Sequence, residues 1–122
     1  MQPTIINNLY GASLARKLSE LLLNDKIKQR IVITPDPHTA QRLEKELNFF
    51  NPNLNTQQFP YWDTLAYDIL SPHQSVISNR IACLSKLRLQ EDCVFFIPIK
   101  TLMNVLCPPD FFDHYHLVLR CG

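Results

Sequence analysis

Glycine is nearly missing from this 122-residue sequence, which contains only Gly11 and Gly122. Loops that wrap a phosphate with their backbone amides depend on the conformational freedom of glycine, so the sequence offers little material for such a loop. An excess of charge of one sign is also lacking. The formal net charge is +1, which provides no overall electrostatic attraction for nucleic acid, so a contact with DNA would have to be local.

Targeting and membrane signals are lacking as well. Residues 1–8 have neither the basic region nor the apolar stretch of a signal peptide. No run approaches the ~18 apolar residues of a membrane span, so we expect a cytoplasmic protein with no membrane partner. The four cysteines, Cys83, Cys93, Cys107 and Cys121, include no closely spaced pair, and we expect them to be reduced thiols.

Apolar residues, by contrast, make up 46% of the sequence, and this length suits one packed domain over residues 1–122. Short β-branched runs alternate with segments whose apolar residues recur at helical spacing. Strands that are apolar without alternation are typical of a parallel sheet covered on both faces. The predicted fold is therefore α/β, with three layers (α/β/α) and a mostly parallel sheet. The predicted helices cover residues 13–23, a segment beginning at Asp36-Pro37 with Ala40, Leu43 and Leu47 buried, a segment from Pro72 to about Arg88, and 101–106; the predicted strands cover 30–34, 56–59, 93–97 and 116–120.

One segment falls in the register of a phosphate-binding loop but departs from its pattern. From Gly11 the spacing is that of G-x-x-x-x-G-K-[ST], but Arg16 stands at the second glycine and Leu18 at the hydroxyl that would hold magnesium. Lys17 alone fits. We interpret the segment as an amphipathic helix with Lys17 in solvent, and we expect this domain to bind neither ATP nor a metal ion.

The most distinctive stretch runs from Phe59 to Leu84. Within it, Ser71 and Gln74 have the spacing of a capping box, in which each side chain bonds the other residue's amide. Pro72 suits the first helical position, where its missing amide hydrogen costs nothing. The stretch is therefore predicted to be an ordered loop that leads into a capped amphipathic helix. The predicted buried face comprises Ile77, Ile81 and Leu84, with Val76, Cys83 and Leu87 beside them.

Two motifs in this sequence match a known family. Residues 59–80 contain F-P-Y-W-D-T-L-A-Y-D, then S-P-H-Q and V-I-S-N-R, and residues 97–103 read I-P-I-K-T-L-M. They resemble F-P-x-W-E-T-L-P-Y-D, S-P-H-Q, I-I-S-x-R and V-P-V-x-T-L-M in the N-terminal module of bacterial transcription-repair coupling factors. Asp63 and Ala66 replace the more usual Glu and Pro. Two long motifs in the same order make this a specific resemblance.

The resemblance implies that the chain is the first subdomain of that module, which is similar to the ATP-binding half of excinuclease B. The module is a RecA-like, helicase-type domain with a degenerate phosphate loop, whereas excinuclease B keeps an intact loop. The whole coupling factor is expected to be an ATP-dependent DNA translocase that displaces stalled RNA polymerase at lesions. It would recruit excision repair through excinuclease A, and ATP and magnesium would act in its translocase module. This domain would then be a scaffold that packs against other domains and performs no chemistry of its own.

The first motif also supplies the candidate site residues, whose aromatic side chains we expect to pin the loop to the sheet; the alternative is that these residues contact other domains. Arg80 is expected to pair with Asp63 or Asp68, with a phosphate contact as the sharper alternative. His73, at the start of a helix, is expected to be neutral because the helix dipole disfavours a cation there. The candidates are Trp62, Asp63, Tyr67, Asp68, Ser71, Pro72, His73, Gln74 and Arg80.

Other functional hypotheses find less support in residue spacing. A catalytic pair of Cys83 and His73 is disfavoured because about 15 Å of helix would separate them. A zinc site is disfavoured because its ligands would lack a C-x2–4-C pair. Its members would be Cys107, His114, His116 and Cys121. A residual nucleotide-binding domain using Lys17 is the alternative function, and a nucleic-acid-binding module would use Arg16, Lys17, Lys26, Lys28 and Arg30.

Overall fold

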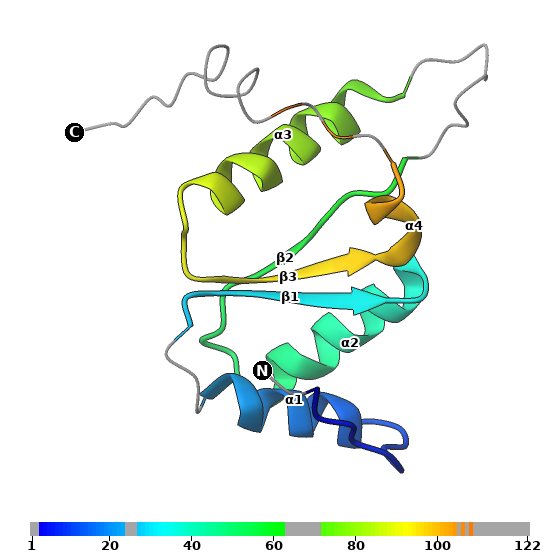
Figure 1. Cartoon of the computed structure of the whole chain (residues 1–122), viewed down its shortest axis with the longest axis vertical. Coiled ribbons are helices and arrows are strands. Elements are labelled where there is room, and N and C mark those ends of the chain that lie inside the picture. The colour runs from blue at the N-terminus through cyan, green and yellow to red at the C-terminus, as the bar shows by residue number, and fades with distance from the viewer. Residues whose placement is uncertain (1–2, 24–26, 63–71, 105, 107, 109–122) are drawn as a thin grey trace.

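The computed structural model describes residues 3–23, 27–62, 72–104, 106 and 108. Helices and strands alternate along these residues, as the sequence predicts (Figure 1). The elements are α1 (Ser13–Leu23), β1 (Gln29–Thr34), α2 (Pro37–Phe50), β2 (Thr56–Gln58), α3 (Gln74–Arg88), β3 (Cys93–Pro98) and α4 (Ile99–Leu102). Among these residues, no helix is long and apolar enough to cross a membrane. The strand predicted over 116–120 lies outside the described residues.

The three strands form one parallel sheet in which β3 lies between β1 and β2. Ile31 of β1 pairs with Phe95 of β3, and Gln58 of β2 pairs with Phe96 of β3. α1 and α2 cover one face of the sheet, and α3 covers the other (Figure 1). The predicted three-layer α/β fold with a parallel sheet is therefore confirmed.

The central strand β3 is buried along its whole length. Val94 and Phe96 join a core cluster with residues of α1 and α2, whereas Phe95 and Ile97 join a second cluster on the α3 side. Burial of each large apolar side chain stabilises the fold by roughly 1.5–3 kcal/mol. The unbroken apolar run in the sequence is explained by this position, since both faces of the strand are covered. The stripe predicted on α2, comprising Ala40, Leu43 and Leu47, is also buried.

The end of β3 differs slightly from the prediction. α4 begins at Ile99, whereas the sequence predicted a helix over 101–106. Pro98 keeps an extended backbone, with φ of −62° and ψ of 138°, and it directly precedes the helix as its N-cap. Because the ring of proline fixes φ and removes the amide hydrogen, Pro98 both ends the strand pairing and suits a helix start.

α3 differs from the sequence predictions in two features, the residue that caps its start and the face that is buried. The N-cap is His73, so Pro72 precedes the cap and is not the first helical residue, and Gln74 opens the helix. Ser71 lies outside the described residues. The buried positions are Arg80 and Cys83. The predicted face is confirmed only in part: Cys83 is buried and Leu84 and Leu87 pack against the core on this side, whereas Ile81 is 45% exposed and Ile77 is only partly buried.

Candidate functional site at the carboxyl edge of the sheet

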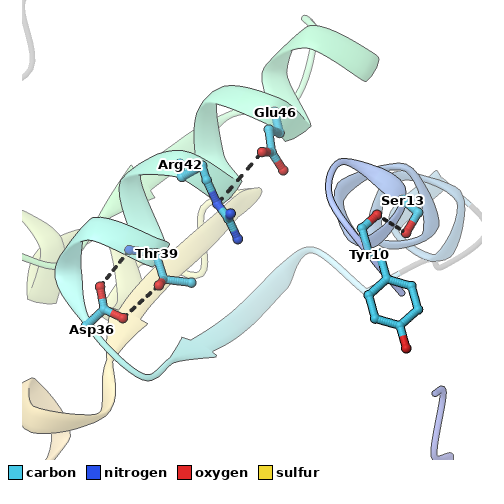
Figure 2. A network of polar contacts seen from close by, with 6 residues as sticks. All are labelled: Tyr10, Ser13, Asp36, Thr39, Arg42 and Glu46. Atoms are coloured by element: carbon cyan, nitrogen blue, oxygen red, sulfur yellow. Dashed lines mark hydrogen bonds and ion pairs between the residues drawn. The ribbon is translucent and has the colours of Figure 1, made fainter. Parts of the chain in front are cut away.

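The segment in phosphate-loop register forms the first turn of α1, where its polar groups bond to one another. The Ser13 amide and the Ser13 hydroxyl both donate to the Tyr10 carbonyl, at 3.2 and 2.6 Å (Figure 2). The Arg16 amide donates to the Ala12 carbonyl at 3.1 Å. A phosphate loop turns such amides toward its ligand, so these two are already engaged by the chain itself.

The side chains of this turn also lack the arrangement of a nucleotide site. Arg16 Nε lies 3.5 Å and Lys17 Nζ 3.3 Å from the carboxylate oxygens of Glu20. Leu18 packs against the core cluster beneath α1, so it is a core residue where a magnesium-binding hydroxyl would stand. No strand among residues 3–10 leads into α1. The predicted amphipathic helix is thus confirmed, and Lys17 is paired on its exposed side.

The helix that follows β1 carries a carboxylate of its own at its N-terminus. Asp36 accepts from the Thr39 amide at 2.8 Å and from the Thr39 hydroxyl at 2.7 Å (Figure 2). These two hydrogen bonds, the hydroxyl bond first, hold the pKa of Asp36 below its usual value of 3.8. In open α/β sheets, anionic ligands bind where such a helix starts at the carboxyl ends of the strands. Here Asp36 fills that position with negative charge, as the predicted Asp36-Pro37 start implies.

Both family motifs leave the sheet at this carboxyl edge. The Phe59 amide donates to the Phe96 carbonyl at 2.9 Å, which continues the β2–β3 pairing beyond Gln58. In that register Pro60 stands next to Pro98. Neither proline has an amide hydrogen, so the pairing cannot continue past them. The two motifs, which are far apart in the sequence, therefore start from adjacent points of the sheet.

Arg80 of α3 contacts the first residues of the first motif. Its guanidinium carbon lies 4.3 Å from the centroid of the Trp62 ring and 4.9 Å from that of the Phe59 ring. Nη1 donates to the Pro60 carbonyl at 2.7 Å. The side chain is only 4% exposed, and its burial lowers the pKa of Arg80. Two aromatic rings and a backbone carbonyl thus hold a buried cation.

Similar proteins identify the family. No family model matches the sequence. The transcription-repair-coupling factor of Haemophilus influenzae is 36% identical over 121 residues, which is 97% of this chain and 10% of that protein. That of Escherichia coli K12 is 32% identical over 118 residues, again 97% and 10%, and that of Rickettsia bellii is 38% identical over 90 residues, 73% and 8%. The chain belongs to the transcription-repair-coupling factors. It spans about a tenth of the length of the curated relatives it matches.

The Arg80 cluster gives this coupling-factor chain a contact that the sequence did not predict. An ion pair with Asp63 or Asp68 was expected, and both aspartates lie outside the described residues, so that expectation stays a prediction. The contacts actually observed are with aromatic rings and a carbonyl. The available signal was the helical phase of Arg80, three residues before the apolar Cys83, which places a charged residue on a buried face.

His73 and Cys83 occupy separate environments on α3, which agrees with the argument against a catalytic pair. His73 is exposed, and its Nδ1 accepts from the Ser75 amide at 3.3 Å as the helix cap. Cys83 is buried, and its Sγ donates to the Gln58 carbonyl at 3.4 Å. Burial raises the pKa of the Cys83 thiol to about 11, so the thiol is un-ionised at neutral pH. It therefore behaves as a small core residue.

The remaining candidates fall partly outside the described residues. Asp63, Tyr67, Asp68, Ser71 and Lys26 lie there, as do the proposed zinc ligands Cys107, His114, His116 and Cys121. Within the described part of the chain, no three His, Cys, Asp or Glu residues are grouped as metal ligands. Of the basic residues considered for nucleic acid, Arg30 Nη1 lies 3.9 Å from the Asp92 carboxylate and Lys28 is exposed.

Proposed function

We propose that this chain is a non-catalytic scaffold and interaction domain of a transcription-repair-coupling factor. In this proposal residues 1–122 are the first subdomain of a module similar to excinuclease B. The complete protein is an ATP-dependent DNA translocase that displaces stalled RNA polymerase at lesions and recruits excision repair. Its partners are RNA polymerase, excinuclease A and duplex DNA, and ATP with magnesium acts in a separate translocase module.

The observation that carries the proposal is that the groups that would bind a nucleotide already have hydrogen-bond partners within the chain. The amides of Ser13 and Arg16 bond to carbonyls of their own turn, and Asp36 caps the helix after β1. A nucleotide phosphate at the start of α1 would have to displace these bonds. A phosphate at the start of α2 would be repelled by Asp36, because both are anionic.

A residual nucleotide-binding domain is the second candidate, and Lys17 is the observation in its favour. Lys17 matches the lysine of the phosphate-loop pattern, and its side chain is 42% exposed. A surface pair such as Lys17–Glu20 stabilises by less than about 1 kcal/mol, so a phosphate could compete for the lysine. Two features count against this candidate: the Ser13 and Arg16 amides already donate to carbonyls of the chain, and Leu18 stands where a magnesium-binding hydroxyl would be needed.

The test is a titration of the 122-residue chain with ATP and magnesium by calorimetry, together with thermal unfolding. A ligand present at 100 times its dissociation constant would stabilise the folded state by about 2.7 kcal/mol. We expect no heat of binding and no shift in the unfolding temperature. A protein with an intact phosphate loop, titrated in the same buffer, is the control. Saturable heat with a matching thermal shift would overturn the proposal in favour of the second candidate.

A further inference from the structure

Arg80 is a buried cation without a counter-ion. Its side chain is only 4% exposed, and arginine is almost never buried this deeply unless it is paired. The groups that contact it are the Phe59 ring, the Trp62 ring and the Pro60 carbonyl, none of which carries a negative charge. No carboxylate forms an ion pair with Arg80 among the residues that the structure describes. The aromatic and carbonyl contacts therefore leave room for an anion.

The guanidinium group of Arg80 also keeps unused hydrogen-bond donors. It carries five N–H groups, and one of them, on Nη1, donates to the Pro60 carbonyl at 2.7 Å. Within the described part of the chain, this side chain makes no other hydrogen bond, and none of its nitrogens is a fully enclosed atom without a partner. All five N–H bonds lie in the guanidinium plane, so an acceptor must approach at the edge of this group.

The charges near this edge are too few and too balanced for the phosphates of a nucleic acid. A nucleic-acid backbone presents a row of phosphates and is bound by several cations. Within three residues after the ends of β1, β2 and β3, the charged residues are Asp36 and Lys100, which have opposite signs. A single unpaired cation in such surroundings suits a single anionic group.

Exposed apolar side chains lie at the same end of the sheet. Pro60 and Pro98 stand next to each other in the β2–β3 register, so Tyr61 and Ile99 follow from adjacent points, and α4 starts there (Figure 1). Tyr61 is 41% exposed, Ile99 43% and Met103 82%. A buried arginine with aromatic rings and an apolar surround is typical of the centre of a protein–protein interface, where Trp, Tyr and Arg contribute most of the binding energy.

We infer that the free edge of the Arg80 guanidinium binds one carboxylate, the acidic side chain of a partner protein that presents it among apolar residues. A carboxylate accepts two parallel N–H···O bonds from a guanidinium edge, and it would supply the negative charge that Arg80 lacks. Apolar neighbours of that carboxylate would cover Tyr61 and Ile99. This inference deepens the proposed interaction function and rests on it. Its test uses no nucleotide, so its failure is distinguishable from a failure of the ATP titration.

The probe is acetate, titrated into the 122-residue chain at constant ionic strength with chloride as the replaced anion. The emission of Trp62, the only tryptophan in the chain, reports binding beside it. We expect a saturable change with acetate and none with acetamide, which has the same shape but no charge. 4-Methylpentanoate should bind more tightly than acetate, because its branched tail reaches the apolar surround.

The variant that tests the geometry is Arg80→Lys, which keeps the positive charge but lacks the planar edge with its paired donors. Acetate should bind to it at least about tenfold more weakly than to the parent chain, which corresponds to about 1.4 kcal/mol. Arg42→Lys on α2, where the arginine is exposed and pairs with Glu46, is the matched control and should bind acetate like the parent. If Arg80→Lys does not fold, the comparison of acetate with acetamide on the parent chain decides alone.

Three results would overturn the inference. The first is the lack of a saturable acetate effect, or an equal effect of acetamide. The second is duplex DNA that displaces acetate in the parent chain but leaves the emission of Arg80→Lys unchanged, since a phosphate would then be the occupant. The third is acetate binding that appears only after Asp63→Asn with Asp68→Asn, because one of the chain's own carboxylates would then fill the edge of Arg80.

Discussion

The sharpest test of the site is Arg80→Met, which keeps an unbranched side chain but removes the charge and all N–H donors. Each guanidinium–ring contact is worth about 0.5–2 kcal/mol, and a hydrogen bond from a charged donor about 1.5–3 kcal/mol. Both rings lie within 5 Å of the guanidinium carbon, at 4.3 and 4.9 Å. Against this gain stands the desolvation of a buried cation, which lowers the pKa of Arg80. We expect a net loss of about 2 kcal/mol in the free energy of unfolding.

The assay uses a built-in reporter, because Trp62 is the only tryptophan in the chain. Urea unfolding is followed by tryptophan fluorescence and by circular dichroism at the same time. In Arg80→Met the native emission of Trp62 should shift to longer wavelength, because the loop that carries the ring loses its anchor and the ring becomes more exposed to water. Arg80→Lys should recover part of the stability but little of the spectrum, because an ammonium group has no planar face to stack.

The control is Arg42→Met on α2, where the arginine is exposed and pairs with Glu46 at 3.8 Å (Figure 2). Such a surface pair contributes about 0.3–0.5 kcal/mol, so this variant should be nearly as stable as the parent chain. If Arg80→Met matched Arg42→Met in stability and left the emission of Trp62 unchanged, Arg80 could not be the anchor of the first motif.

Three further predictions concern the cap, the core thiol and the phosphate-loop register. The lowered pKa of Asp36 stabilises the fold above pH 3.8, and this contribution is lost as the pH falls through the folded value. Asp36→Asn should therefore flatten acid unfolding, and an unchanged acid profile would contradict the cap. The raised pKa of Cys83, about 11 against 9.0, gives stability that is complete below pH 9 and lost between pH 9 and 11, by up to about 2.7 kcal/mol. Cys83→Ala should reduce that alkaline slope in urea titrations, while the buried Cys93 thiol, whose pKa burial also raises, keeps its own share; a slope equal to the parent's would refute the prediction. Arg16→Gly with Leu18→Thr restores the residues of the phosphate-loop pattern. Calorimetry should still detect no binding of ATP to this variant, because the backbone of α1 stays helical. Clear binding would show that the side chains of residues 16 and 18 alone abolish the site.

The parts of the fold that the sequence predicted are those governed by local signals. The buried strand at β3 follows from an apolar run without alternation, and the start of α2 follows from Asp36 placed before Pro37. Both signals act over a few residues and need no knowledge of the partner element. The alternation of such segments was enough to predict a parallel three-layer sheet, since few other arrangements bury them.

The buried face of α3 was predicted only in part, because two faces of that helix compete. Ile77 and Ile81 form an apolar stripe that resembles a core face, whereas the observed core face includes the charged Arg80. What selects that face is tertiary: Arg80 finds the rings of Phe59 and Trp62, and Lys86 reaches Gln57. A sequence pattern measures how apolar a face is, but it does not show which aromatic rings or carbonyls will receive a cation.

Internal partners also distinguish this part of the chain from a working nucleotide site. In a working site, helix amides, a lysine and a hydroxyl remain available until the ligand satisfies them. In this chain, the Ser13 and Arg16 amides, Lys17 and the N-terminus of α2 each have an internal partner, so folding itself supplies what a ligand would. The stabilisation that a nucleotide would give on binding is thereby built into the fold. Under the proposed scaffold function, a domain arranged in this way stays ordered without ATP.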